Sequence, residues 1–169
     1  ANVDVRHRKF DQHASQWNWA VHETGVDTDW VLALDADYAV NDGFLREASR
    51  VIGQTECAGV RARFRYCIHG HALRASLYPP VTVLFRSALG HYAQDGHTQR
   101  LIVNGTVTEI ATPIAHDDRK PLSTWIAAQD RYSTLESDWL CAKAADGLSM
   151  PDRIRRWIVV APWLVPIYC

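Results

Sequence analysis

Two aspartates, Asp35 and Asp37, form an Asp-x-Asp motif directly after a continuous apolar run, residues 30–34. Such a run predicts a β-strand buried on both faces, and in extended backbone side chains two apart point to the same side. We therefore expect the two carboxylates to converge at the carboxyl end of this strand, where open α/β sheets bind ligands. Paired carboxylates suit Mg²⁺ or Mn²⁺, the cations that hold diphosphates. The alternative is a strand that runs into an acidic turn, with an aspartate capping a helix.

Further polar residues lie near the middle of the chain. Three arginines alternate with apolar residues across residues 58–68, which predicts one half-buried strand with a basic face formed by Arg61, Arg63 and Arg65. That face either contacts phosphate groups or is simply solvated. In the loop that follows, residues 67–80, His69 and His71 flank a glycine and suit either a metal or a pair of surface histidines.

Length and composition describe a globular protein with one core. The chain has 169 residues, of which 47% are hydrophobic and 22% charged, and its formal net charge is −1. This charge gives no overall field for nucleic acid, so we expect no nucleic-acid partner. The four cysteines have no Cys-x-x-Cys spacing and fit a reduced cytosolic protein. The first residues lack the apolar core of a signal peptide, and no segment is apolar for long enough to span a bilayer.

The remaining pattern predicts a layered α/β domain. Expected helices cover residues 12–24, 42–52 and 121–145, with Asp11 and Asn41 as the N-caps of the first two. Expected strands cover residues 2–6, 30–34, 58–68 and 81–86. A β-hairpin is expected at residues 101–111 around Asn104-Gly105, which is a strong turn signal.

Four blocks of residues stand out together by their order and spacing. They are Phe10-Asp11 with Gln16-Trp17-Asn18; residues 28–37 with the Asp-x-Asp motif; residues 95–100 with Asn104-Gly105; and residues 116–120, His-Asp-Asp-Arg-Lys, with Trp125 and Arg131-Tyr132. In this combination the chain resembles the family 2 glycosyltransferases of the GT-A fold. The branch that looks most similar adds sugars to the lipopolysaccharide core or to related bacterial glycolipids.

This resemblance implies an incomplete GT-A domain, a Rossmann-like, layered α/β fold with a mixed sheet, a β-hairpin and long carboxyl-terminal helices. The family begins with several more β/α units that hold the nucleotide base. Residues 1–148 are therefore expected to form a catalytic domain that lacks those amino-terminal units, and residues 149–169 a separate amphipathic and apolar segment.

The resemblance also implies a metal-dependent, inverting transfer of a sugar from a nucleotide-diphosphate sugar to a glycolipid or cell-envelope polysaccharide. Asp37 is expected to bind Mn²⁺ or Mg²⁺, Asp35 to bind the metal or the donor ribose, and His116 to supply a third metal ligand, which suits Mn²⁺. A cation there would neutralise the charge that grows on the departing diphosphate. The alternative for His116 is a loop histidine that caps the next helix.

The same resemblance assigns the other roles. Asp95 takes the place of the family's acidic catalytic block and is the expected general base, with His97 as a competing candidate. Relatives often carry an acidic pair or His-Glu at this place, whereas this chain reads Asp-Gly-His-Thr-Gln-Arg. Arg100 is expected to hold the diphosphate and Arg131 to face the substrate cleft, although both also suit solvated surface positions.

The carboxyl-terminal segment carries three arginines, Arg153, Arg155 and Arg156, before a Trp-rich apolar run. This pattern is typical of a peripheral membrane contact and predicts a cytoplasmic protein on the inner face of the cell membrane. The alternative is a core helix whose partner is absent from this chain. Two other functions stay open: a non-catalytic glycan- or lipid-binding module, and a metal-dependent phosphohydrolase, which the mixed α/β pattern argues against.

Overall fold

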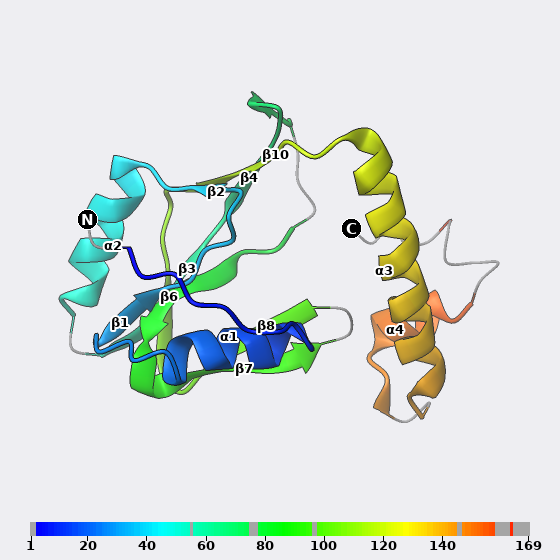
Figure 1. The fold of residues 1–169 in the computed structure, drawn as a ribbon, viewed down its shortest axis with the longest axis horizontal. Helices are drawn as coiled ribbons and strands as arrows, with labels where there is room; N and C mark the ends of the chain where they lie inside the picture. The colour runs from blue at the N-terminus through cyan, green and yellow to red at the C-terminus, as the bar shows by residue number, and fades with distance from the viewer. Residues whose placement is uncertain are drawn as a thin grey trace. The chain divides into compact units, whose positions relative to one another are not determined.

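The chain folds into two compact units, residues 1–119 and residues 120–169. The computed structural model describes residues 3–54, 56–74, 78–95, 98–144, 147–157 and 163. All the strands described and two α-helices belong to the first unit, and two further α-helices belong to the second (Figure 1). The α/β class predicted from the sequence is therefore confirmed.

Three sheets build the first unit. The strand bounds are β1 Trp30–Leu32, β2 Tyr38–Ala39, β3 Cys57–Ala62, β4 Phe64–Ile68, β5 His71–Ala72, β6 Val81–Arg86, β7 Gly90–Asp95, β8 Thr98–Val103, β9 Thr106–Glu109 and β10 Ile114–Asp118. The strand orders are β1-β6-β3-β9, β2-β10-β4-β5 and β7-β8. Both four-stranded sheets are mixed, because β3 pairs with β9 and β4 with β10 in parallel while the other pairings are antiparallel.

Two segments that are far apart in the sequence run side by side from the first sheet into the second. β3 leads into β4, β9 leads into β10, and both pairs are parallel. At the junction the Ile114 amide donates to the Arg63 carbonyl at 3.0 Å, so the hydrogen bonding continues between the sheets. The register of β4 and β10 then sets His116 opposite Tyr66.

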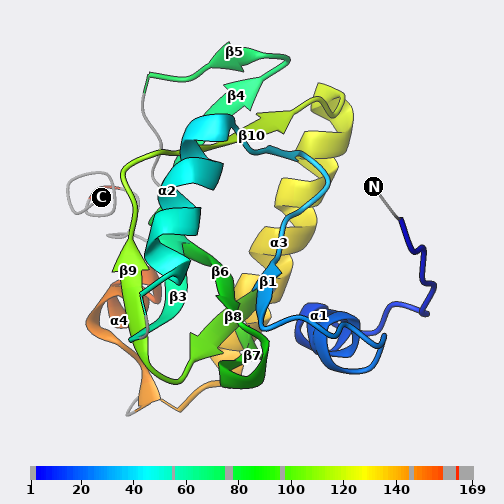
Figure 2. The same cartoon turned by 90° about the vertical axis from the view of Figure 1, so that its left-hand side faces the viewer.

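Two helices cover the strands of the first unit. α1 (His13–His22) packs along β7 and β8, and α2 (Asp42–Ile52) packs on β3 (Figures 1 and 2). Each buries apolar residues at helical spacing, as the sequence predicted: Ala14 and Val21 from α1, and Phe44, Ala48 and Val51 from α2. The largest fully buried side chains are Phe44, Val60, Phe85 and Ile114. Each contributes about 1.5–3 kcal/mol through burial, so these few residues hold helices and sheets together.

The start of α2 follows the predicted capping rule. The Asn41 side-chain oxygen accepts a hydrogen bond from the Phe44 amide at 2.9 Å, which satisfies one of the donors that a helix start leaves open. The predicted N-cap is confirmed, and so are the helix bounds.

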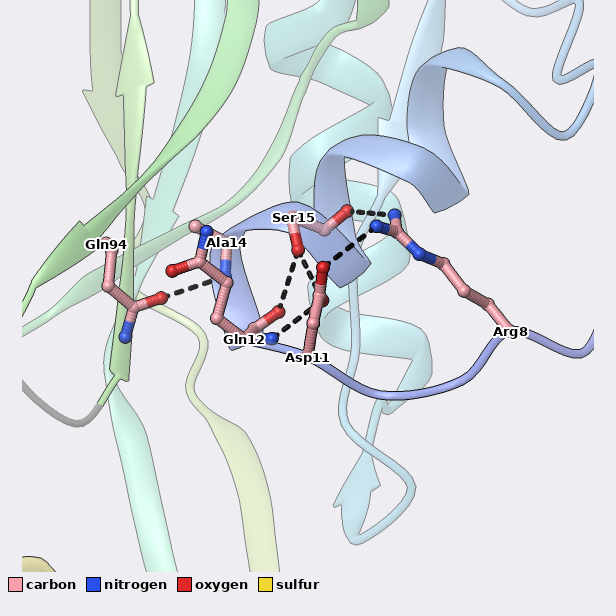
Figure 3. A network of polar contacts seen from close by, with 6 residues as sticks. All are labelled: Arg8, Asp11, Gln12, Ala14, Ser15 and Gln94. Carbon is pink, nitrogen blue, oxygen red and sulfur yellow. Dashed lines mark hydrogen bonds and ion pairs between the residues drawn. The ribbon is translucent and has the colours of Figure 1, made fainter.

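The start of α1 lies one residue later than predicted. Its N-cap is Gln12, whose side chain makes no capping bond. Asp11 lies just outside the helix and accepts from the Gln12 amide at 2.6 Å and from the Ser15 hydroxyl (Figure 3). Arg8 fixes this turn by donating to the Asp11 carboxylate at 3.1 Å and to the Ser15 carbonyl at 2.8 Å. Asp11 therefore organises the approach to α1 rather than capping it.

Two strand predictions near the amino terminus were wrong. Residues 3–6, the described part of the expected strand at residues 2–6, form no strand. The run at residues 30–34 gives only the short β1, which lies at the edge of its sheet and pairs antiparallel with β6. Leu32 is 37% exposed, so this strand is not buried on both faces. The apolar run instead continues past the strand, and Leu34 packs against the core beyond it.

Two further strand predictions were wrong, one in the extent of the strand and the other in its pairing. The expected strand at residues 58–68 breaks at Arg63 into β3 and β4, which belong to different sheets, although Arg61, Arg63 and Arg65 are all exposed as predicted. The expected hairpin around Asn104-Gly105 does not form, because β8 pairs with β7 and β9 pairs with β3.

The second unit is helical in its described part. α3 (Leu122–Ala142) confirms the long helix expected from residue 121, and Ser149 caps the short α4 (Met150–Arg155). Several large apolar side chains of this unit are exposed: Leu122, Trp125, Ile126, Leu135, Met150, Trp157 and Trp163. Among the described residues, no helix has the length and apolar character needed to cross a membrane.

We predict that Glu47→Gln destabilises the first unit at neutral pH. The two Glu47 carboxylate oxygens accept from the Ala111 and Thr112 amides, each at 2.9 Å, and tie α2 to the turn before β10. Glutamine keeps only one acceptor oxygen. The thermal midpoint measured by circular dichroism should therefore fall by roughly 2–4 °C at about pH 7.

The loss of stability in Glu47→Gln should depend on pH, and this dependence serves as a control. The Ala111 amide, followed by Thr112, holds the pKa of Glu47 below its ordinary value of 4.5. A folded-state pKa below the unfolded value means that the stabilisation exists above the unfolded pKa and is lost as the pH falls through the folded one. The two proteins should thus converge in acid. Glu23→Gln, which changes an exposed carboxylate after α1, should have little effect, and equal losses in both variants would contradict the prediction.

Candidate functional site

The Asp-x-Asp motif lies in a tight turn between β1 and β2. The Tyr38 amide donates to the Asp35 carbonyl at 3.0 Å, so the backbone from Asp35 to Tyr38 folds back instead of remaining extended. The expectation that extended backbone aims both carboxylates to one side was therefore wrong. The structure contains the acidic turn of the alternative interpretation, but the helix that follows is capped by Asn41 and not by an aspartate.

Asp37 nevertheless meets another predicted metal ligand. Its carboxylate Oδ2 lies 3.2 Å from Nε2 of His116, and both side chains are largely buried, with 27% and 16% exposed. Two backbone contacts fix the pair, because Tyr38 lies opposite His116 in the ladder and the Asp117 amide donates to the Asp37 carbonyl at 3.0 Å. His116 lies within β10 and is not the helix-capping loop histidine considered as its alternative.

A side-chain hydrogen bond joins Asp35 to Tyr38. Burial raises the pKa of Tyr38 well above its ordinary value of 10.0, and the charge of Asp35 and a hydrogen bond to it raise that pKa further. The Asp37 charge adds to this effect. In the described part of the chain, no three histidine, cysteine or acidic side chains are grouped closely enough to hold a metal ion. The structure thus brings Asp37 and His116 together and leaves Asp35 nearby, beside Tyr38.

Aromatic rings surround the His116 imidazole. Its centroid lies 4.9 Å from the Tyr38 ring, 4.3 Å from the Tyr66 ring and 6.4 Å from the Phe64 ring. Tyr38 and Phe64 also contact each other, at 4.7 Å. These rings come from β2, β4 and β10, which are neighbours in one sheet. The rings pack against the imidazole and restrict its orientation.

Asp95 lies at the end of β7 and forms a long ion pair with Arg100. The Arg100 guanidinium Nε is 3.5 Å from the Asp95 carboxylate, and both side chains are exposed to solvent, at 68% and 42%. Elsewhere in β7, burial raises the pKa of Tyr92, and the charge of Asp35 adds to this effect. His97 lies outside the described residues.

No pattern in the sequence indicated how β7 is held. The Asn18 side chain of α1 donates to the Tyr92 carbonyl at 2.8 Å and accepts from the Tyr92 amide at 2.8 Å. One turn earlier, the Ala14 amide donates to the side-chain oxygen of Gln94 at 3.2 Å (Figure 3). Asn18 pairs with the backbone as a neighbouring strand would. It belongs to a block of the family resemblance, but its position in a helix gave no sign of this contact.

The Asp117 carboxylate stabilises the turn between β4 and β5. Its carboxylate accepts from the Gly70 amide at 2.7 Å and from Arg119 Nε at 2.7 Å, and the Gly70 bond is the larger cause of a lowered pKa of Asp117. The φ angles of His69 and Gly70, 48° and 81°, are those of a two-residue hairpin turn between β4 and β5. Asp117 therefore holds this turn. The His-Gly-His sequence forms part of a hairpin.

The remaining candidates belong to the second unit. Arg131 lies on α3 with its guanidinium 5.4 Å from the Tyr132 ring centroid. Arg155 pairs with Asp152 at 3.4 Å, and Arg156 donates to two carbonyls at the end of α3. Much of the expected membrane-contact segment, residues 158–162 and 164–169, lies outside the described residues.

No family model matches this chain, and neither does any curated protein or solved structure.

We predict that Asn18→Ala loosens β7. The variant removes both hydrogen bonds to Tyr92 and leaves its backbone groups without that partner, so the free energy of unfolding should fall by about 2 kcal/mol. Hydrogen exchange should accelerate at the Tyr92 amide. The control is Asn104→Ala, which changes an exposed asparagine in the turn before β9. Unchanged exchange at Tyr92 would show that Asn18 does not hold the strand.

Proposed function

We propose that this chain carries the metal-binding and acceptor-activating residues of an inverting glycosyltransferase of family 2, with a GT-A fold. The observation that supports this best is the 3.2 Å contact between Asp37 and His116. The family resemblance pairs these same two residues as metal ligands. They come from distant parts of the sequence and meet beside aromatic rings, next to the turn that contains Asp35.

The donor set of this site fits Mn²⁺ better than Mg²⁺. Asp37 offers a carboxylate and His116 an imidazole nitrogen, and imidazole suits Mn²⁺ whereas Mg²⁺ prefers oxygen. Two protein ligands are enough for a cation that completes its shell with diphosphate oxygens and water. Bound there, the cation would neutralise the charge on the departing nucleoside diphosphate. Asp35 fits the second role proposed for it, binding the donor ribose, because a hydrogen bond already joins its side chain to Tyr38.

The acceptor step requires a base. In an inverting transfer the acceptor oxygen bonds to the anomeric carbon as the bond to the diphosphate breaks, and the hydroxyl proton passes to a carboxylate. Asp95 is accessible at the end of β7, where Nε of Arg100 lies 3.5 Å from its carboxylate. An alternative role for Arg100 is to leave this acid and bind the diphosphate, as the resemblance implies.

The alternative function is a non-catalytic module that binds a glycan or a lipid. The exposed Tyr78 beside the aromatic site favours a glycan over a lipid. Membrane contact at the inner face of the cell membrane, a cytoplasmic location and a role for Arg131 stay predictions.

We predict that Asp37→Ala removes Mn²⁺ binding. Titration of the chain with Mn²⁺, followed by electron paramagnetic resonance with and without uridine diphosphate, should show a weaker affinity in the variant. The loss should exceed the roughly 10- to 100-fold that changes outside the ligand shell cause. Asp29→Ala removes an exposed carboxylate just before β1 and is the matched control. Equal affinity in Asp37→Ala and the unchanged chain would exclude this site.

We predict that Asp95→Asn keeps Mn²⁺ and nucleotide binding but loses transfer. Asparagine preserves the shape of the side chain and cannot take the acceptor proton, so only the transition state is destabilised. Turnover, measured as release of nucleoside diphosphate with bacterial glycolipid acceptors, should fall about 10²- to 10⁴-fold. Glu109→Gln is the control, since Glu109 is also a strand carboxylate paired with an arginine, at 3.0 Å from Arg63. Near-normal turnover in Asp95→Asn would exclude it as the base.

A further inference from the structure

Tyr78, which lies shortly before β6, is 63% exposed. Its ring stacks on the Tyr66 ring of β4, with the centroids 4.7 Å apart and the planes inclined by 26°. Two prolines, Pro79 and Pro80, follow directly and restrict the backbone. An exposed aromatic ring thus has a second ring packed against it and a restricted backbone after it.

The stacked tyrosines continue the aromatic site described above. Tyr66 contacts both the Tyr78 ring and the His116 imidazole, the latter at 4.3 Å. His116 contacts Asp37 in turn. Two rings, Tyr78 and Tyr66, would therefore connect a ligand stacked on Tyr78 to the Asp37–His116 pair.

The exposed ring of Tyr78 suits a neutral ligand. Packing on an aromatic face gains dispersion energy and buries apolar surface, so a ligand on this ring requires no charge of its own.

We propose that Tyr78, supported by Tyr66, is a stacking platform for the pyranose ring of a neutral saccharide. A pyranose has an apolar face of C–H groups that packs on an aromatic ring, and hydroxyls around it that bond to tyrosine O–H groups. The assignment of this saccharide as the acceptor rests on the proposed glycosyl transfer, whereas its binding does not.

The test is saturation-transfer difference NMR on the whole chain without added metal. The probes are the methyl pyranosides of glucose, galactose, mannose and N-acetylglucosamine, and uridine is included to represent a nucleobase. At least one pyranoside should receive saturation, strongest at the C–H groups of one ring face. Tyr78→Leu should weaken its binding about tenfold, and Tyr78→Phe should keep most of it because the ring remains.

Two controls distinguish saccharide binding at Tyr78 from binding to another exposed ring and from Mn²⁺ binding. Phe10→Leu removes another exposed ring of the first unit and should leave saccharide binding unchanged. Asp37→Ala should abolish Mn²⁺ binding without abolishing saccharide binding, so the platform and the metal site fail independently. The platform is excluded if no pyranoside binds, if Tyr78→Leu binds as well as the unchanged chain, or if only uridine depends on Tyr78. A circular dichroism melt of each variant shows whether its fold is intact.

Discussion

The parallel pairing of residues 57–68 with residues 106–118 is the constraint on which the first unit depends. These segments cross together from one sheet to the other. Because they are far apart in the sequence, the chain must lose the entropy of closing a long loop before their pairing contributes any stability. Fully buried Val60 and Ile114, one on each segment, supply the compensating burial with Phe44 of α2. Once this ladder exists, the positions of β2 and β5 follow, since both pair onto its strands.

The local signals of the sequence were sufficient for the helices and not for the strand partners. Asn41 caps α2 through a bond within one helical turn, and apolar spacing alone locates the buried face, so neighbours in sequence decide both. Asn104-Gly105 is an equally local signal, but whether it closes a hairpin depends on a distant strand. A side-chain carbon added at Gly105 would lie 2.7 Å from Cβ of Ala58, and the φ angle of Gly105 is 136°. This glycine allows β9 to approach β3 closely, and its φ differs from the values near 60–90° of the common hairpin turns.

The candidate site was predictable in its residues and not in its geometry. Asp35, Asp37 and His116 follow from residue type and from the family resemblance, yet the turn at Asp35 removes the extended backbone from which convergence of the two acids was expected. Asp37 reaches His116 because β2 and β10 are paired, which no local pattern encodes. The hydrogen bonds of Asn18 were even harder to predict from the sequence. A helical asparagine ordinarily faces solvent, and only the position of β7 beside α1 turns it into a backbone partner.

Under the proposed function, the charges of the site set an order of binding. Asp35 and Asp37 both contribute negative charge near Tyr38, and Arg100, which is proposed to bind the diphosphate, pairs with Asp95. A nucleotide sugar brings further negative charge, so under the proposed function it gains from this site only after a cation has changed the sign of the local potential. A neutral saccharide on Tyr78 meets no such barrier. Release of the diphosphate with its cation would restore the negative potential around the acids. The two carboxylates proposed to hold the donor would then disfavour its product, while the exposed aromatic ring would still be open to an uncharged partner.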